Sequence, residues 1–184
     1  MMYRVNHPPQ LSGNNSSHKS IKMSNFTDLD HAFMKRAFEL AHQAEQIGEI
    51  PIGAVLTLDD KIIGEGFNRS IIDNDPTAHA EIVAIRQAAK SILNYRLPQT
   101  TLYVTLEPCS MCAGAIIHSR VQRLVYGAKD EKTGACGSIF NVISTNDKNH
   151  RISPEQGLMA EESSTLLSDF FVRRRSEIKM QKLK

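Results

Sequence analysis

Tryptophan, cysteine and long apolar stretches are absent or scarce in this chain. Its 184 residues include no tryptophan and three cysteines. No run of about 18 or more apolar residues occurs, which excludes an ordinary transmembrane helix. The N-terminus also lacks the charged start and apolar stretch of a secretory signal. An odd number of cysteines does not build a disulfide framework. We therefore predict a cytoplasmic protein without a membrane segment.

The composition that is present suffices for one folded domain. Hydrophobic residues make up 41% of the chain and charged residues 23%, a balance typical of a protein with a buried core. Residues 1–27 differ, because they are rich in Ser, Asn and Pro, contain no acidic residue and show no period. We predict a disordered leader over residues 1–27 and a single domain over residues 28–184. An organellar transit peptide is an alternative for the leader, although a single Arg and no amphipathic stripe disfavour it.

The positive charge gathers at the C-terminus. Residues 173–184 contain six Lys or Arg against one acid, so they carry +5, whereas the whole chain carries +2 and the remainder therefore −3. A cationic end on a mildly acidic body is typical of an edge that binds a polyanion. A solvated helix end, with its cations near the negative pole of the helix dipole, explains the same pattern.

The pattern of apolar residues predicts alternating helices and strands. Thr27 or Asp28 can cap a first helix that Gly48 closes. Residues 52–58 and 61–67 read as a hairpin. A helix is expected after Asp75-Pro76, followed by a strand at 101–106, a helix after Pro108 and a strand at 121–126. Segment 129–151 should be irregular except for one helical turn near Phe140, and a terminal helix is expected around 166–171. Strands that alternate with helices after a hairpin predict an α/β fold with a mixed sheet covered on both faces.

Two short segments carry metal-ligating residues. His79 follows Pro76 at the start of one expected helix, and Cys109 and Cys112 follow Pro108 in the first turn of the next. The two cysteines point the same way, and the positive end of the helix favours their thiolate forms. Two sulfurs and one imidazole are a ligand set that zinc prefers.

The number of ligands decides which kind of zinc site this is. Structural zinc is closed by four protein ligands, whereas catalytic zinc keeps one position open for water. Three ligands have paired spacing here, which favours the open, catalytic site. Cys136, His118 or His150 could supply a fourth ligand and close the site.

Glu81 lies two residues after His79. On a regular helix these positions diverge by about 200°, so both can face one metal only if His79 lies in the first turn or at the cap, where Pro76 places it. A carboxylate there can move protons as a general acid and base. As a lone residue, Glu81 would more often be an exposed acid that favours the helix dipole, but beside His79 and the two cysteines the catalytic interpretation is favoured.

His-x-Glu followed by Pro-Cys-x-x-Cys is the signature of zinc nucleobase deaminases. Over residues 28–182 the chain closely resembles the bacterial tRNA-specific adenosine deaminase family. The matching stretches beyond the zinc segments are residues 49–55, 66–69, 102–119, 132–134 and 167–171 with the arginines that follow.

The resemblance implies a cytidine-deaminase-like fold, a three-layer α/β/α sandwich with a five-stranded mixed sheet. It also implies a homodimer with one zinc ion (Zn2+) per subunit, which converts adenosine to inosine at the wobble position of a tRNA anticodon. By position, His79, Cys109 and Cys112 would bind zinc and Glu81 would be the catalytic proton shuttle. Asn68 would bind the target base, Asp130 the neighbouring nucleotides, and Phe171, Arg174 and Arg175 the anticodon stem-loop.

Other functions use the same zinc motif. A free-base or nucleotide deaminase that acts on cytosine, guanine or cytidine shares its chemistry, and the terminal helix with its arginines is the feature that favours RNA over such a small substrate. A non-catalytic zinc module that binds RNA is disfavoured by Glu81 and by the missing fourth ligand. Without the resemblance, Asn68 could simply end a strand, and Phe170 and Phe171 could simply pack.

Overall fold

The computed structural model describes residues 26–143 and 150–182. The predicted leader lies outside the described residues except for its last two. Helix α1 (Asp28–Gln46) begins where the sequence predicts, because Thr27 caps it and forms a capping box with Asp30. Gly48, at φ +83°, follows the end of this helix in the left-handed region that glycine adopts readily.

Five strands form one mixed sheet in the order β2-β1-β3-β4-β5. Their bounds are β1 Gly53–Leu58, β2 Lys61–Phe67, β3 Thr101–Leu106, β4 Arg123–Ala128 and β5 Ser153–Gln156. Strand β1 runs antiparallel to β2 and β3, whereas β3, β4 and β5 are parallel. The register pairs Ala54 with Gly66 in the hairpin and Leu102 with Leu124 in the parallel part.

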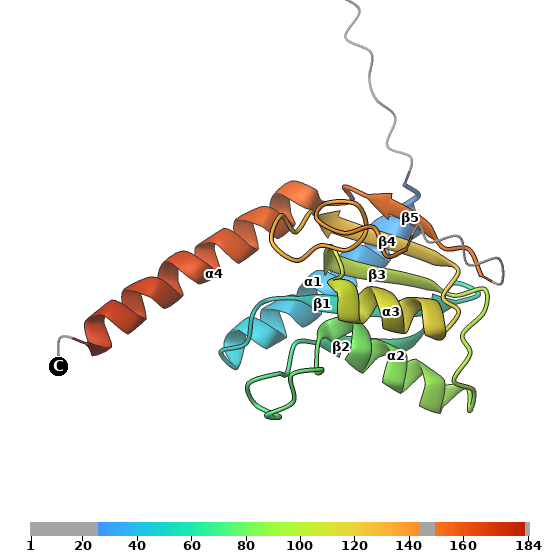
Figure 1. Ribbon diagram of the computed structural model, residues 1–184, viewed down its shortest axis with the longest axis horizontal. Helices are drawn as coiled ribbons and strands as arrows, with labels where there is room; N and C mark the ends of the chain where they lie inside the picture. Colours follow the sequence, from blue (N-terminus) through green and yellow to red (C-terminus); the bar gives the residue numbers. More distant parts are fainter. Residues whose placement is uncertain (1–25, 144–149, 183–184) are drawn as a thin grey trace, which may run out of the picture.

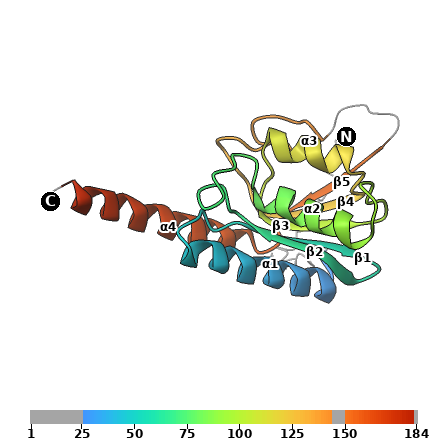
Figure 2. The same ribbon diagram turned by 90° about the horizontal axis from the view of Figure 1, so that it is seen from below.

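Helices cover both faces of the sheet (Figures 1 and 2), with α2 (Ala80–Ser91) and α3 (Ser110–His118) on one face and α1 and α4 (Ala160–Gln181) on the other. Successive residues of a strand point to opposite faces. Leu102 and Val104 therefore join the core under α2 and α3, whereas Tyr103 joins the core under α1. The predicted three-layer α/β/α sandwich is confirmed. No helix of the described residues is long and apolar enough to span a membrane.

Helix α2 lies unusually close to the hairpin. A Cβ atom on Gly66 would approach the Ala80 carbonyl oxygen to 2.3 Å and the Ala84 nitrogen to 2.6 Å. Glycine is therefore required at this position of β2. The close approach sets the first turn of α2, and with it His79, against the end of the sheet.

In the C-terminal third, one prediction is wrong and one strand was not predicted. The helical turn predicted near Phe140 is wrong, since the chain there forms turns and an isolated bridge between Cys136 and Asn141. Gly137, at φ +130°, lies outside helical geometry. The pattern of apolar residues also did not predict strand β5. This strand contains Pro154 and mostly exposed side chains, which suit a sheet edge but leave no apolar alternation to detect.

Candidate active site

A cavity of about 550 Å³ opens at the end of the sheet where β2, β3 and β4 finish. These three strands run in the same direction, so the segments that follow them meet at the same end of the sheet. In Figure 1 this is the end from which α4 leaves the body of the molecule. The volume suits a nucleobase-sized ligand. The lining residues are Ile50, Ile52, Asn68, His79, Glu81, Leu106, Glu107, Cys109, Lys129, Asp130, Glu131, Lys132, Thr133, Ser164, Leu167 and Phe171.

Helix starts position the three predicted metal ligands. His79 is the N-cap of α2 and Cys109 is the N-cap of α3, while Cys112 lies one turn into α3 and is fully buried. The Asn68 side-chain oxygen accepts a hydrogen bond from the Ala80 backbone N–H at 2.9 Å, which holds the first turn of α2. The prediction that His79 lies at a helix cap is confirmed.

The three ligand atoms have the spacing of a tetrahedral zinc site. His79 Nδ1 lies 3.7 Å from Cys109 Sγ and 3.6 Å from Cys112 Sγ. Zinc bonds of about 2.0–2.1 Å to nitrogen and 2.3 Å to sulfur, at a tetrahedral angle, place N and S about 3.6 Å apart. The residues present therefore fit a zinc ion.

A fourth protein ligand is not found among the described residues. The group of side chains close enough to share a metal consists of His79, Cys109 and Cys112. Cys136 and His118 are not part of it. His150 instead places Nε2 at 2.6 Å from the Val121 carbonyl oxygen. Three ligands leave one position for water, as a catalytic site requires.

The electrostatics of the cluster favour metal binding. The hydrogen bond from Cys112, supported by His79, lowers the pKa of the Cys109 thiol to about 4. The hydrogen bond between His79 and Cys109 raises the pKa of His79. The same pairing, together with burial, raises the pKa of Cys112, so in the metal-free protein one thiolate and one thiol share the site. Binding of a metal would displace the remaining proton, that of the Cys112 thiol.

Glu81 lines the same cavity and is only 4% exposed. Burial raises the pKa of its carboxyl group, although His79 counteracts this in part. A raised pKa moves a carboxyl group toward the range in which it can both accept and donate a proton. The simpler alternative from the sequence, an exposed acid in the first helical turn, does not hold.

The structure divides the predicted substrate-binding residues into two groups. Asn68, Asp130 and Phe171 line the cavity, whereas Arg174 and Arg175 are exposed on α4 and do not. Asp130 accepts hydrogen bonds from the backbone of Lys132 and from Thr133 within its own loop.

Phe171 is 39% exposed and packs edge-on against the buried Phe170. The Lys132 ammonium lies 5.9 Å from the centre of the Phe171 ring. One aromatic ring thus faces the core and the other the cavity, so Phe171 is available to stack on a base.

Sequence reasoning did not assign a role to Glu107, which lines the cavity and is buried. The signal was present, because a charged residue stood directly before Pro108-Cys109 at the end of an apolar strand. Apolar wall residues such as Ile50 and Leu167 were also not singled out.

Comparisons with known proteins show the family to which the chain belongs. The MafB19-like deaminase family matches residues 27–175. The tRNA-specific adenosine deaminase of Haemophilus influenzae is 57% identical over 157 residues, covering 85% of this chain and 91% of that protein. The Bacillus subtilis protein of the same name is 43% identical and covers 77% of this chain and 88% of its own length.

Solved structures show the same fold. One from a study of A-to-I editing by tRNA:A34 deaminases at the wobble position superposes with a TM-score of 0.71 and 46% identity, over 74% of this chain and 99% of that one. The guanine deaminase of Nitrosomonas europaea superposes with a TM-score of 0.66 and 25% identity, over 76% of this chain and 83% of that one.

Proposed function

This chain belongs to the tRNA-specific adenosine deaminase family, and we propose that it hydrolyses adenosine to inosine at the wobble position of a tRNA anticodon. The enzyme would act in the cytoplasm as a homodimer with one zinc ion per subunit. Residues 28–184 would form its deaminase domain and residues 1–27 a leader, of which residues 1–22 could be deleted without loss of activity.

His79, Cys109 and Cys112 would hold the zinc ion. When bound, zinc supplies the polarisation that makes a water molecule nucleophilic at neutral pH. Apo protein would therefore be inactive but would keep its cavity.

Glu81 would carry the protons of the reaction. Its carboxylate would accept a proton from the attacking water and deliver it to adenine N1, and the next proton would go to the departing amino group. Water and adenosine are thereby converted to inosine and ammonia. A raised pKa suits both directions of transfer, since the group must be protonated and deprotonated in one cycle.

Asn68 and Phe171 would hold the base. The Asn68 oxygen already binds the Ala80 N–H, so the NH2 group is the donor that it can offer a purine. Phe171 would stack on a base, and Asp130 would contact nucleotides beside it. An unpaired anticodon base is cheaper to extrude into such a cavity than a base in a duplex.

The observation that carries the proposal is the buried Glu81 in one cavity with three ligands at zinc spacing. The test is to incubate zinc-loaded protein with an anticodon stem-loop that has adenosine at the wobble position, and separately with free adenosine, cytidine and guanine. We expect inosine in the stem-loop and little turnover of the small substrates. Guanine turnover with an inert stem-loop would instead favour a guanine deaminase, whose fold is shared.

A further inference from the structure

Glu107 lies between the end of β3 and the metal ligand Cys109. It is 2% exposed, and its carboxylate is turned toward the segment 129–138 that follows β4. In Figure 1 this segment is the orange loop near the N-terminal end of α3. A buried carboxylate needs strong partners to offset the loss of hydration.

All four partners of this carboxylate are hydrogen-bond donors from that segment. Oε1 accepts the backbone N–H of Cys136 at 2.9 Å and that of Ser138 at 3.1 Å. Oε2 accepts the backbone N–H of Asp130 at 3.1 Å and the Ser138 hydroxyl. One side chain therefore satisfies three backbone groups of an irregular loop, which has no strand or helix ladder to bind them.

The loop wraps closely around the carboxylate. A Cβ atom on Gly134 would lie 2.6 Å from the Glu107 carboxyl group. Gly134 also bridges to Cys109, and the Ala135 N–H donates to the Pro108 carbonyl oxygen at 2.8 Å. The segment is thus fastened to the chain that carries the metal ligand.

The same segment forms one wall of the cavity. Residues 129–133 line it together with Glu81 and Cys109. Asp130 is therefore both a wall residue and, through its backbone N–H, a partner of Glu107.

We infer that Glu107 is a positioning residue that clamps segment 129–138 as the substrate-facing wall of the active site. It touches no reacting atom in this scheme. Loss of the Glu107 carboxylate should weaken substrate binding more than it slows the chemical step, since the metal ligands and Glu81 do not belong to segment 129–138. The substrate that this wall would face is the one named in the proposed function, and to that extent the inference rests on it.

The first test measures the clamp without substrate. Glu107→Gln keeps the size of the side chain, but its NH2 group would face donors, so it cannot accept from both sides of the loop. In zinc-loaded protein we expect faster amide hydrogen exchange at Asp130, or at Cys136 and Ser138, depending on which way the amide turns.

Glu49→Gln is a matched control. Glu49 is also 2% exposed, and it accepts the backbone N–H groups of Ile71 and Ile72 in a different loop at 2.7 and 2.8 Å. Both N–H groups donate to the same oxygen, Oε1, so the amide oxygen of glutamine can keep both bonds. We therefore expect Glu49→Gln to leave residues 71–72 and segment 129–138 protected, whereas Glu107→Gln should loosen segment 129–138.

The second test separates binding from chemistry. With the anticodon stem-loop, Glu107→Gln should raise KM by about tenfold, the loss expected for a charged hydrogen bond, while kcat stays within about threefold and zinc content is unchanged. If Glu107→Gln does not fold, Ser138→Ala removes one partner and should raise KM by a smaller factor in the same direction.

Unchanged exchange in segment 129–138 would overturn the inference, as would an unchanged KM or a fall in kcat as large as the rise in KM. If the parent enzyme does not deaminate the stem-loop, the proposed function fails. The exchange comparison with Glu49→Gln still decides whether Glu107 is a clamp.

Discussion

Two carboxyl groups at opposite ends of the same sheet are buried to the same degree, but their pKa values are shifted in opposite directions. Asp30 is 3% exposed and Glu81 is 4% exposed. The pKa of Asp30 lies well below its usual range, whereas the pKa of Glu81 is raised. Burial acts on both in the same direction, so the difference comes from their partners.

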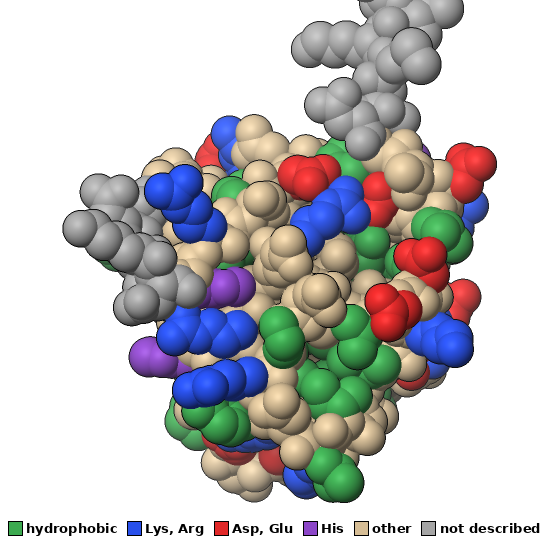
Figure 3. Space-filling model, turned by 90° about the vertical axis from the view of Figure 1, so that its right-hand side faces the viewer, with side chains coloured by type: hydrophobic (Ala, Val, Ile, Leu, Met, Phe, Trp, Pro, Cys, Tyr) green, Lys and Arg blue, Asp and Glu red, His purple; other side chains and the backbone are tan. Residues whose placement is uncertain are grey.

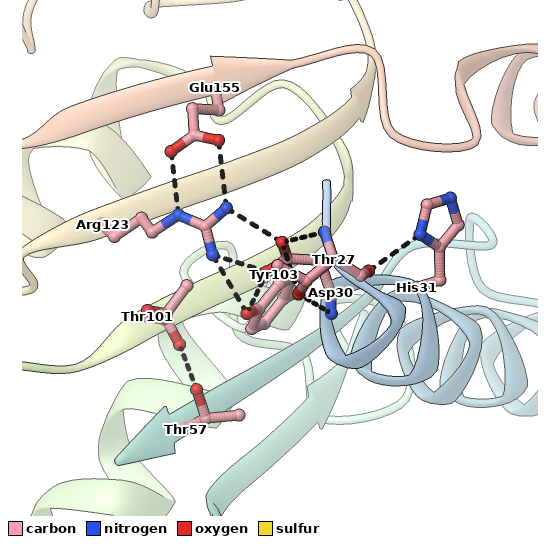
Figure 4. A network of polar contacts seen from close by, with 8 residues as sticks. All are labelled: Thr27, Asp30, His31, Thr57, Thr101, Tyr103, Arg123 and Glu155. Carbon is pink, nitrogen blue, oxygen red and sulfur yellow. Dashed lines mark hydrogen bonds and ion pairs between the residues drawn. The ribbon is translucent and has the colours of Figure 1, made fainter. Parts of the chain in front are cut away.

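Asp30 belongs to a fully paired network near the beginnings of β3, β4 and β5 (Figure 4). Arg123 binds Asp30 Oδ1 through Nη1 at 2.5 Å and Glu155 through Nε at 2.8 Å. The Tyr103 hydroxyl donates to Asp30 Oδ1 at 2.7 Å, and the Thr27 N–H donates to Oδ2 at 2.8 Å. The network joins α1 to three strands.

Glu81 faces the cavity, with the sulfurs of Cys109 and Cys112 in the same cluster, and its charge interaction with His79 offsets the effect of burial only in part. Burial without strong pairing costs stability but leaves a proton free to move. The end of the sheet that holds Asp30 thus stabilises the fold, and the end that holds Glu81 would serve the proposed chemistry.

The largest expected effect is on catalysis. Glu81→Gln should lower inosine formation by about 10²–10⁴-fold, because an amide cannot shuttle protons. Thermal stability should stay the same or rise, since a poorly compensated buried acid is removed. Zinc content and stem-loop affinity are the controls. Turnover within tenfold of the parent would contradict the role of Glu81.

The next largest effect is on stability. Arg123→Met should lower the free energy of unfolding by about 2–4 kcal/mol, because it leaves Asp30 buried without its cation. The kcat for the stem-loop should not change, since the network lies at the far end of the sheet. Urea unfolding measures the loss. The double variant Arg123→Met/Asp30→Asn should recover part of it, and a lack of coupling would show that the pair is not the cause.

The sequence predicted these two regions unequally. His79, Glu81, Cys109 and Cys112 were predicted because short spacings and helix-start residues define them locally. Asp30 and Arg123 are 93 residues apart, and no local pattern marks their contact. The same reason hid Glu107, whose partners lie 23 to 31 residues away and are mostly backbone groups. Local chemistry can be read from a sequence, whereas long-range pairing requires the fold.

A smaller effect appears as pH dependence. The folded pKa of Asp30 is lower than its unfolded value, so its contribution to stability is present above about pH 4 and is lost as pH falls through the folded pKa. We expect the zinc-loaded parent protein to lose stability on acidification. Protonation of Asp30 should account for a loss on the order of 1–2 kcal/mol in the free energy of unfolding. Asp30→Asn should flatten that part of the curve, measured by urea unfolding from pH 5 downward. An equally steep curve in this variant would assign the acid sensitivity elsewhere.

The smallest effect concerns surface charge on α4. The surface at the opposite end of the molecule carries side chains of both signs (Figure 3), whereas α4 carries Arg173, Arg174 and Arg175 in succession. Among the described residues, Arg173 binds Glu45 of α1 at 2.8 Å, whereas Arg174 pairs with Glu177 of its own helix at 3.3 Å. Arg174 and Arg175 are therefore the side chains that we expect to contact RNA phosphates.

Arg174→Gln/Arg175→Gln should weaken stem-loop binding several-fold at low salt. It should also reduce the slope of log K against log salt by about 1.4, or 0.7 for each phosphate contact. Arg173→Gln is the control, because its loss should reduce stability slightly and leave the slope nearly unchanged. Binding titrations at several salt concentrations give both quantities. If the Arg173 variant flattens the slope as much as the double variant does, the charge of α4 acts as a whole and the assignment to Arg174 and Arg175 is wrong.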